Sequence, residues 1–147
     1  MKLYISIFIL FFSIQIYSQE SIAEAWVELP AFIDHTISIN TSGLEKFTDK
    51  IFFVWTLFDY KKPLSIEEVS DDIKKAKYYY IFNNESEKYS ILQVIYYDSK
   101  GNVVKSFSYD RDTENQKYKF NFPVYDSGDE RTIYNFCTEY ITKSNTK

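Results

Sequence analysis

Few residues of this sequence could do chemistry. His35 is the only histidine and Cys137 the only cysteine. His35 follows Asp34, and an imidazole beside a carboxylate could act as an acid–base pair. If both residues lie in one strand, however, their side chains point to opposite faces, which favours a surface or capping histidine. One histidine and one cysteine also exclude a histidine/cysteine zinc site within a single chain.

Two acidic clusters, Asp110–Asp112 and Asp126–Glu130, could supply oxygen ligands to calcium. Neither has the twelve-residue spacing of an EF-hand loop. The second cluster is better placed at the start of a helix, where carboxylates are favoured. The sequence also has no glycine-rich phosphate loop, G-x-S-x-G elbow or dinucleotide fingerprint. We therefore expect no enzyme, no cofactor and no metal site, with weak calcium binding as the open alternative.

The first residues are typical of an export signal. Lys2 precedes the apolar run Leu3–Ile14, and a small residue, Ser18, lies near a plausible cleavage point. The run is short for a membrane span, so an uncleaved anchor is the less favoured alternative, and no cysteine at the cut could carry a lipid. The sequence predicts a signal peptide over residues 1–19 and a single domain over residues 20–147. We expect the protein in the periplasm, at the outer-membrane surface or secreted, with no membrane span after cleavage.

The composition limits the partner and the fold class. The 17 basic and 21 acidic residues give a net charge of −4, which argues against nucleic acid or anionic lipid as the primary partner. The only local basic patch, Lys74 to Lys77, is most simply a solvated face. Because the chain has 14 tyrosines, 13 phenylalanines and only 3 glycines, its composition favours a sheet.

Several segments have the two-residue period of strands. Ala23–Leu29 alternates with Ala23, Ala25, Val27 and Leu29 on one side, and Phe32–Ile39 alternates with its apolar side on the odd numbers. Ile51–Phe58 is apolar on both sides apart from one threonine, which predicts a central strand covered on both faces. Two aromatic runs flank Asp98–Asn102, where Gly101 permits the tight reversal of a hairpin. A polar loop over 111–118 and a short strand ending near Pro123 follow.

Two other segments have helical spacing. Between Pro63 and Lys77 the apolar residues follow this spacing after a possible capping box of Ser65 and Glu68, which predicts a short helix. Ser127 and Glu130 form a second such box before a predicted helix from about Gly128 to Lys143. Its apolar face comprises Ile133, Phe136, Cys137, Tyr140 and Ile141. The sequence therefore predicts an α+β fold, an antiparallel β-sheet of about six strands with the C-terminal α-helix packed on one face.

In order and spacing, these segments resemble the surface-adhesin protein E family of small exported bacterial proteins. The resemblance rests on Trp26, on F-I-D-H-T-I-S-I with Asp34, on V-W-T-L-F-D-Y-K-K-P with Trp55, on Y-S-I-L-Q-V-I-Y-Y-D-S-K-G with Tyr96 and Gly101, and on Pro123, Ser127 and Cys137. We assign structural roles to Trp26, Asp34, Trp55, Tyr96, Gly101, Ser127 and Cys137. The resemblance implies an exported, adhesin-like, non-enzymatic binding protein whose relatives contact host extracellular proteins.

Members of that family carry two cysteines, and the resemblance implies a disulfide from helix to sheet. The position of the first one falls at about Asn84 in this sequence, so Cys137 would be the unpaired half of a lost bridge. We expect a buried, unreactive thiol, because free cysteine packs as a small hydrophobic side chain. An intermolecular disulfide or a reactive thiol is the alternative.

The tyrosines are the candidates for recognition. Tyr96 and Tyr97 are adjacent, so one should point into the core and the other outward, and Tyr79 belongs to a similar run. Outward Tyr79 and Tyr97 would form a protein-binding surface, unless they serve only to pair strands. We predict binding of a protein through an exposed sheet face or edge, where a homodimer could also form. The alternative is a small-ligand carrier with a pocket between helix and sheet, lined by Phe53, Trp55 and Phe136.

Overall fold

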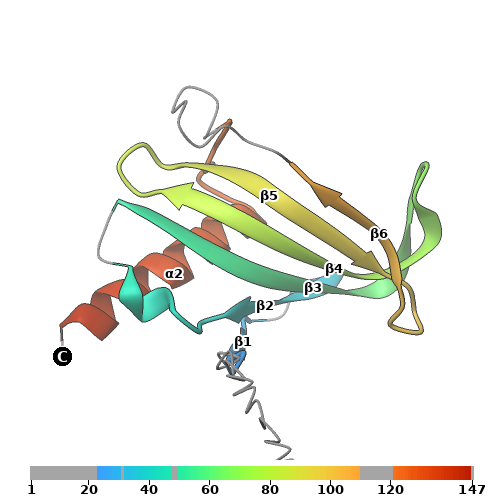
Figure 1. The fold of residues 1–147 in the computed structure, drawn as a ribbon, viewed down its shortest axis with the longest axis horizontal. Coiled ribbons are helices and arrows are strands. Elements are labelled where there is room, and N and C mark those ends of the chain that lie inside the picture. Colours follow the sequence, from blue (N-terminus) through green and yellow to red (C-terminus); the bar gives the residue numbers. More distant parts are fainter. Residues whose placement is uncertain (1–22, 31, 48–49, 110–120, 147) are drawn as a thin grey trace, which may run out of the picture.

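The structure, a computed structural model, describes residues 23–30, 32–47, 50–109 and 121–146. In these ranges the chain forms one antiparallel sheet and a C-terminal helix (Figure 1). The elements are β1 (Trp26–Glu28), β2 (His35–Asn40), the 3-10 helix η1 (Leu44–Lys46), β3 (Ile51–Ile66), β4 (Ser70–Asn83), β5 (Lys88–Tyr97), β6 (Val103–Ser108), β7 (Phe122–Pro123) and α2 (Asp129–Asn145). The signal peptide, the 111–118 loop and the cluster at 110–112 lie outside the described residues.

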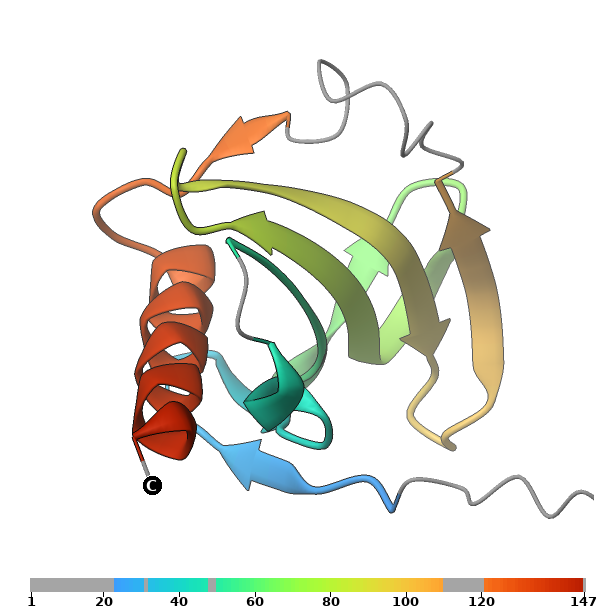
Figure 2. The same ribbon diagram turned by 60° about the vertical axis from the view of Figure 1, so that its left-hand side comes forward.

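The strands follow one another in space as they do along the chain, in the order β1-β2-β3-β4-β5-β6, and β7 pairs with the first residues of β5. The helix α2 stands against one side of the curved sheet, whereas β6 and the β3–β4 hairpin lie at its far end (Figure 2). The predicted α+β fold, with about six antiparallel strands and a C-terminal helix packed on them, is confirmed.

One side of the sheet and α2 enclose the core. Ile133 and Cys137 of α2 are fully buried, and the ring of Tyr134 lies 5.8 Å from that of Phe82 and 6.3 Å from that of Phe52. The predicted inward position of Cys137 is confirmed. The predicted apolar face of the helix did not include Tyr134, which lies two positions before Phe136. In the structure Tyr134 is almost completely buried.

The start of α2 differs from the prediction. Gly128, at φ +112°, occupies the N-cap position, and no side chain caps the helix, so the capping box of Ser127 and Glu130 is wrong. Glycine adopts this backbone conformation without steric cost. A serine at the N-cap would instead have used its hydroxyl to accept a hydrogen bond from a backbone N–H of the first turn. The carboxylates of Asp129 and Glu130 lie in the first turn, as expected from the helix dipole.

The predicted helix between Pro63 and Lys77 is wrong, because β3 continues to Ile66 and β4 begins at Ser70. Glu68 is at the tip of this hairpin with φ +62°, a turn conformation incompatible with a capping role. The helical spacing in this segment is outweighed by the adjoining aromatic runs, which pair along most of β3 and β4 and extend the ladder outward.

Two strand predictions also need correction. In β3, burial alternates: Phe52, Val54, Thr56 and Phe58 are buried and the residues between them only half-buried, so the strand is covered on one face and not on both. In the first strand only Leu29 is buried, and Val27 is 38% exposed. The reason is that β1 is an edge strand with a single neighbour.

The remaining strand predictions agree with the structure, except that the strand expected from Phe32 begins only at His35. His35, Ile37 and Ile39 form the buried side of β2. The β5–β6 hairpin turns at Gly101, at φ +84°, and the Asp98 carboxylate accepts hydrogen bonds from the backbone N–H groups of Lys100 and Asn102.

Candidate functional site

The sheet has a second face, on the side away from α2, which we call the outer face. The register places Trp55 opposite Tyr79, Leu57 opposite Lys77, and Asp59 opposite Lys75. These positions alternate with the buried residues of the same strands and therefore point to the outer face. No described element covers them, and their side chains are half-buried by one another.

Aromatic rings lie side by side on the outer face. The rings of Trp55 and Tyr79 stack with centroids 4.6 Å apart and planes 18° apart. Phe53 lies 6.0 Å from Tyr79 and 6.1 Å from Phe47, which follows η1. We call Phe53, Trp55, Tyr79 and Trp26 of β1 the aromatic row. The rings of Phe53, Trp55 and Tyr79 shield one another from water. This explains how β3 can be apolar on both sides although other elements cover only one of its faces.

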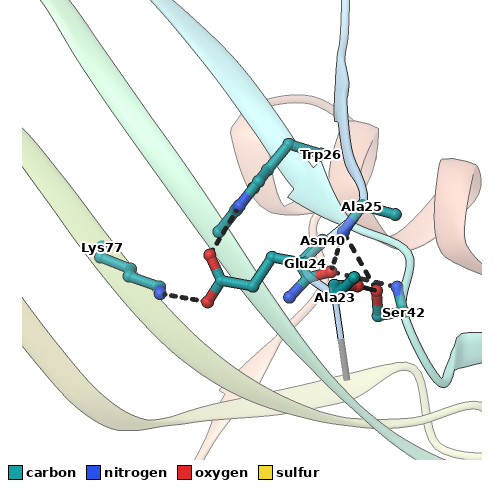
Figure 3. A network of polar contacts seen from close by, with 7 residues as sticks. All are labelled: Ala23, Glu24, Ala25, Trp26, Asn40, Ser42 and Lys77. Atoms are coloured by element: carbon teal, nitrogen blue, oxygen red, sulfur yellow. Dashed lines mark hydrogen bonds and ion pairs between the residues drawn. The ribbon is translucent and has the colours of Figure 1, made fainter. Parts of the chain in front are cut away.

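Lys77 lies near both tryptophans of the row, and Figure 3 shows its contact with Glu24 beside Trp26. Its ammonium nitrogen lies 5.2 Å from the Trp26 ring and 5.0 Å from the Trp55 ring, within the range of cation–π attraction. It also lies 3.1 Å from Glu24 Oε1, while Trp26 Nε1 donates a hydrogen bond of 2.9 Å to Glu24 Oε2. The pKa of Glu24 is lowered by the hydrogen bond from Trp26 and then by that from Lys77. The network thereby ties β1 to β4, across the two strands between them.

A shallow pocket of about 170 Å³ lies at the end of the aromatic row. It is lined by Asn40, Ser42, Gly43, Phe47, Phe53, Val54, Trp55 and Tyr79. Sites for drug-sized ligands typically occupy about 300 Å³ or more, so this depression is suited to a single side chain. Phe53 and Trp55, expected to meet Phe136 in a carrier pocket, lie on the face opposite the helix, and the structure does not bring the three together.

Tyr79 and Tyr97 both lie on the outer face, whereas Tyr96 points inward. Tyr96 packs edge-on against Phe107 at 6.2 Å, and burial raises its pKa. Tyr97 pairs with Lys75, four residues along β4 from Tyr79, so the two outward tyrosines are roughly 13 Å apart and do not touch. The neighbours of Tyr79 are instead Trp55 and Phe53. The sequence analysis did not predict that Trp55 and Phe53 lie on an exposed face. The signal for it was the run Ile51–Phe58, which contains both residues and is apolar on both sides.

His35 is buried, whereas the sequence predicted a surface or capping histidine. It also contacts Asp34, whereas the two side chains were expected to point to opposite faces of a strand. Its Nδ1 lies 2.6 Å from Asp34 Oδ1, and its Nε2 lies 3.3 Å from Asp129 Oδ2 at the start of α2. The contact with Asp34 is possible because β2 begins at His35, so Asp34 precedes the strand and its side chain is not forced to the opposite face. The hydrogen bond from His35 lowers the pKa of Asp34.

The surroundings of His35 indicate a structural role. The ring stacks on Phe32 at 4.8 Å and on Phe58 at 5.4 Å, and both of its nitrogens face carboxylates. A groove of about 390 Å³ is lined by Asp34 together with Ile33, Tyr60, Lys61, Lys62 and Leu64, but His35 is not among its lining residues. The histidine therefore packs between the start of β2 and the start of α2, although within the described residues its Nε2 makes no hydrogen bond.

Cys137 is a free, buried thiol, and burial raises its pKa far above the ordinary value. Asn84, where the family resemblance implies the partner cysteine, is bound to the same helix through another residue: the Tyr134 hydroxyl donates a hydrogen bond to Asn84 Oδ1. A polar contact thus joins α2 to the β4–β5 turn at the place where a disulfide was expected in the family.

No family model, curated protein or solved structure matches this chain. The similarity to the surface-adhesin protein E family therefore stays a prediction. In the described part of the chain, no helix is long and apolar enough to cross a membrane. The same residues contain no group of three or more histidine, cysteine, aspartate or glutamate side chains placed to hold a metal ion.

Proposed function

We propose that this protein is an exported, non-enzymatic binding module, adhesin-like in character, that recognises another protein through the outer face of its sheet. The observation that carries the proposal is the aromatic row, which leaves two tryptophans, a tyrosine and a phenylalanine half-exposed on one face. Tryptophan and tyrosine are the residue types that most often dominate the binding energy of protein interfaces.

The charges of the outer face support recognition by apolar contact. Lys77 pairs with Glu24 at 3.1 Å and Lys75 pairs with Asp59 at 3.0 Å, so these cations are already neutralised within the chain. Electrostatic attraction accelerates association mainly when a surface carries unbalanced charge. We therefore expect binding to depend on the aromatic side chains and to change little with salt.

Export is supported by the N-terminal sequence pattern, and the adhesin-like character by the family resemblance. The carrier alternative has less support, because the described pocket next to the aromatic row is small and the core between α2 and the sheet is filled by fully buried side chains. The identity of the bound protein does not follow from the fold.

A capture experiment tests the proposal. The purified protein is immobilised and incubated with cell-envelope and extracellular-matrix fractions, alongside the Tyr79→Ala and Tyr97→Ala variants. The matched control is Tyr125→Ala, an aromatic residue 72% exposed outside the outer face. We expect one specific protein to be retained by the wild type and by the control, and lost with the two outer-face variants. Recovery of no specific protein, or equal recovery by all four, would contradict the proposal.

A further inference from the structure

The groove between the segment before β2 and the outer part of β3 has no role in the proposed function. Its volume of about 390 Å³ falls within the range of small-molecule sites, whereas the depression beside the aromatic row is too small. Such sites are mostly apolar and contain a few charged or polar groups that orient the ligand. This groove has that composition, since it is lined by Ile33, Tyr60 and Leu64 together with Asp34, Lys61 and Lys62.

One wall of the groove is fixed by hydrogen bonds. The Lys61 ammonium donates to the carbonyl oxygens of Phe32 and Ile33 at 2.9 and 2.7 Å. The backbone N–H of the same lysine donates to the Asp34 carbonyl at 2.8 Å, and that of Phe32 to the His35 carbonyl at 3.2 Å. The backbone of Ile33 is thereby held in place, although the residue is 95% exposed. A ligand that covers an apolar side chain on a fixed backbone orders little of the chain when it binds.

The opposite wall lies where β3 leaves its regular pairing with β4. The pairing stops after Asp59 and resumes, with a shifted register, at Leu64 opposite Ile73. Pro63 lies within the interruption and has no N–H to donate to a neighbouring strand. Irregularities of this kind redirect side chains and are frequent next to functional sites. Leu64, the first residue after the interruption, is 39% exposed and lines the groove.

The charges of the groove favour an anion. The lining contains two ammonium groups, those of Lys61 and Lys62, and one carboxylate, that of Asp34. This carboxylate already contacts His35 Nδ1 at 2.6 Å, and Lys61 is engaged by two carbonyl groups. Lys62 makes no ion pair with any described residue. An unbalanced cation therefore lies beside apolar surface, and a ligand that complements both has an anionic head and an apolar body.

We propose that this groove binds a small amphipathic anion, with its charged head at Lys62 and its aliphatic chain packed against Ile33 and Leu64. Fatty acids and other alkyl carboxylates have this chemistry. Binding removes the apolar surface of Ile33 from water, which is favourable. The site differs in place and in lining from the carrier pocket expected between helix and sheet, and it gives the protein a small-ligand function in addition to the recognition of another protein.

Titration of the isotopically labelled protein with octanoate, followed through the chemical shifts of its backbone amides, tests this site. We expect saturable shifts for the N–H groups of residues 32–34, 60–62 and 64, which surround the groove. Octylammonium has the same chain and the opposite charge, and it should bind about fivefold more weakly or worse. If octanoate leaves these amides unshifted, or if the two probes bind equally well, the proposal is overturned.

Two substitutions separate the charge from the apolar contact, and both replace exposed side chains that the fold does not need. Lys62→Gln should weaken octanoate binding about two- to fivefold and reduce the preference over octylammonium. Ile33→Ser should weaken the binding of both probes by a similar factor and leave the preference intact. The matched controls Lys100→Gln and Val103→Ser change exposed residues of the β5–β6 hairpin and should bind as the wild type does. Groove variants that bind octanoate as tightly as these controls overturn the proposal.

The titration is independent of the proposed recognition of another protein. It contains only the purified protein and the two probes, and none of its variants changes the aromatic row or Tyr97. A failure of the titration therefore leaves the capture experiment unaffected, and the reverse also holds.

Discussion

The two faces of the sheet use the same residue classes on the same strands, yet they differ in burial. On the inner face, Phe52, Tyr80 and Phe82 are at most 2% exposed, because they lie under α2 or its neighbours. On the outer face, Phe53 and Tyr79 occupy alternating positions of those strands and are only half-buried. Aromatic content therefore does not decide burial in this protein. For these rings the face of the sheet on which they lie decides it, although Ile81, opposite Phe53 in the register, is also only 1% exposed.

The difference separates stability from recognition. Rings on the inner face gain the full free energy of burial and pack against several neighbours. Rings on the outer face gain part of it from one another and keep the remaining apolar surface in contact with water. Exposed apolar surface of this kind is typical of interaction sites. Matched substitutions on the two faces should therefore change stability to different degrees.

The largest expected effect is on the inner face. Phe82→Ala removes a fully buried ring from between Phe52 and Tyr134 and should lower the free energy of unfolding by about 3–5 kcal/mol. Phe53→Ala, the matched change on the outer face of the paired strand, should cost roughly 1 kcal/mol, because its ring is partly solvated in the folded state. Urea denaturation measures both. Equal losses would mean that the outer face is part of the core.

An intermediate effect is expected at alkaline pH. Burial raises the pKa of Tyr78, Tyr80 and Cys137, so these groups stay protonated in the folded protein. The unfolded chain loses these protons at the ordinary values, near pH 9 for cysteine and pH 10 for tyrosine. The folded state then binds more protons than the unfolded state, so stability is intact below about pH 9 and decreases as the pH rises further.

The Tyr78→Phe variant tests this alkaline loss. It removes one buried ionisable hydroxyl, and the free energy of unfolding should then fall less steeply between about pH 9 and pH 11. Tyr125→Phe, at an exposed position, should leave the slope unchanged. Urea unfolding at a series of pH values gives both slopes, and identical slopes for Tyr78→Phe and the wild type would show that Tyr78 does not carry the effect.

Local signals in the sequence predicted the parts of the fold that local chemistry decides. The Asp98–Asn102 turn was recognisable because glycine supplies the positive φ and the aspartate accepts backbone hydrogen bonds. The helix α2 was recognisable because its apolar stripe repeats over three turns. The β3–β4 hairpin was not, since a capping-box pattern followed by helical spacing was present, and only pairing with distant residues overrides it.

The candidate site was predictable only in part. The outward direction of Tyr79 relative to its neighbours follows from strand alternation, but the positions of Trp55 and Phe53 depend on which face α2 covers. The approach of Trp26 and Lys77 joins β1 to β4, and no spacing in the sequence encodes such a contact. His35 was misjudged because its environment depends on where β2 begins and on Asp129, almost a hundred residues later.

The smallest effect on stability is expected from the Lys77 network, and it is also the most specific. Both tryptophans of the chain, Trp26 and Trp55, contact Lys77, so tryptophan fluorescence reports on the outer face alone. Glu24→Gln weakens the attraction to Lys77 and should cost at most about 1 kcal/mol, because Glu24 is largely exposed. The emission should nevertheless shift, since the acceptor of the Trp26 Nε1 hydrogen bond loses its charge.

The control for this change is Glu139→Gln, which weakens another surface ion pair, with Lys143 on α2. It should cost a similarly small free energy of unfolding but leave the tryptophan emission unchanged, because both tryptophans lie beside Lys77 on the outer face, on the side of the sheet away from α2. If both variants left the emission unaltered, Trp26 would not be held over Lys77 in solution, and the edge strand would not contribute to the outer face. A shift confined to Glu24→Gln would show that the outer face is assembled by contacts that stability measurements barely register.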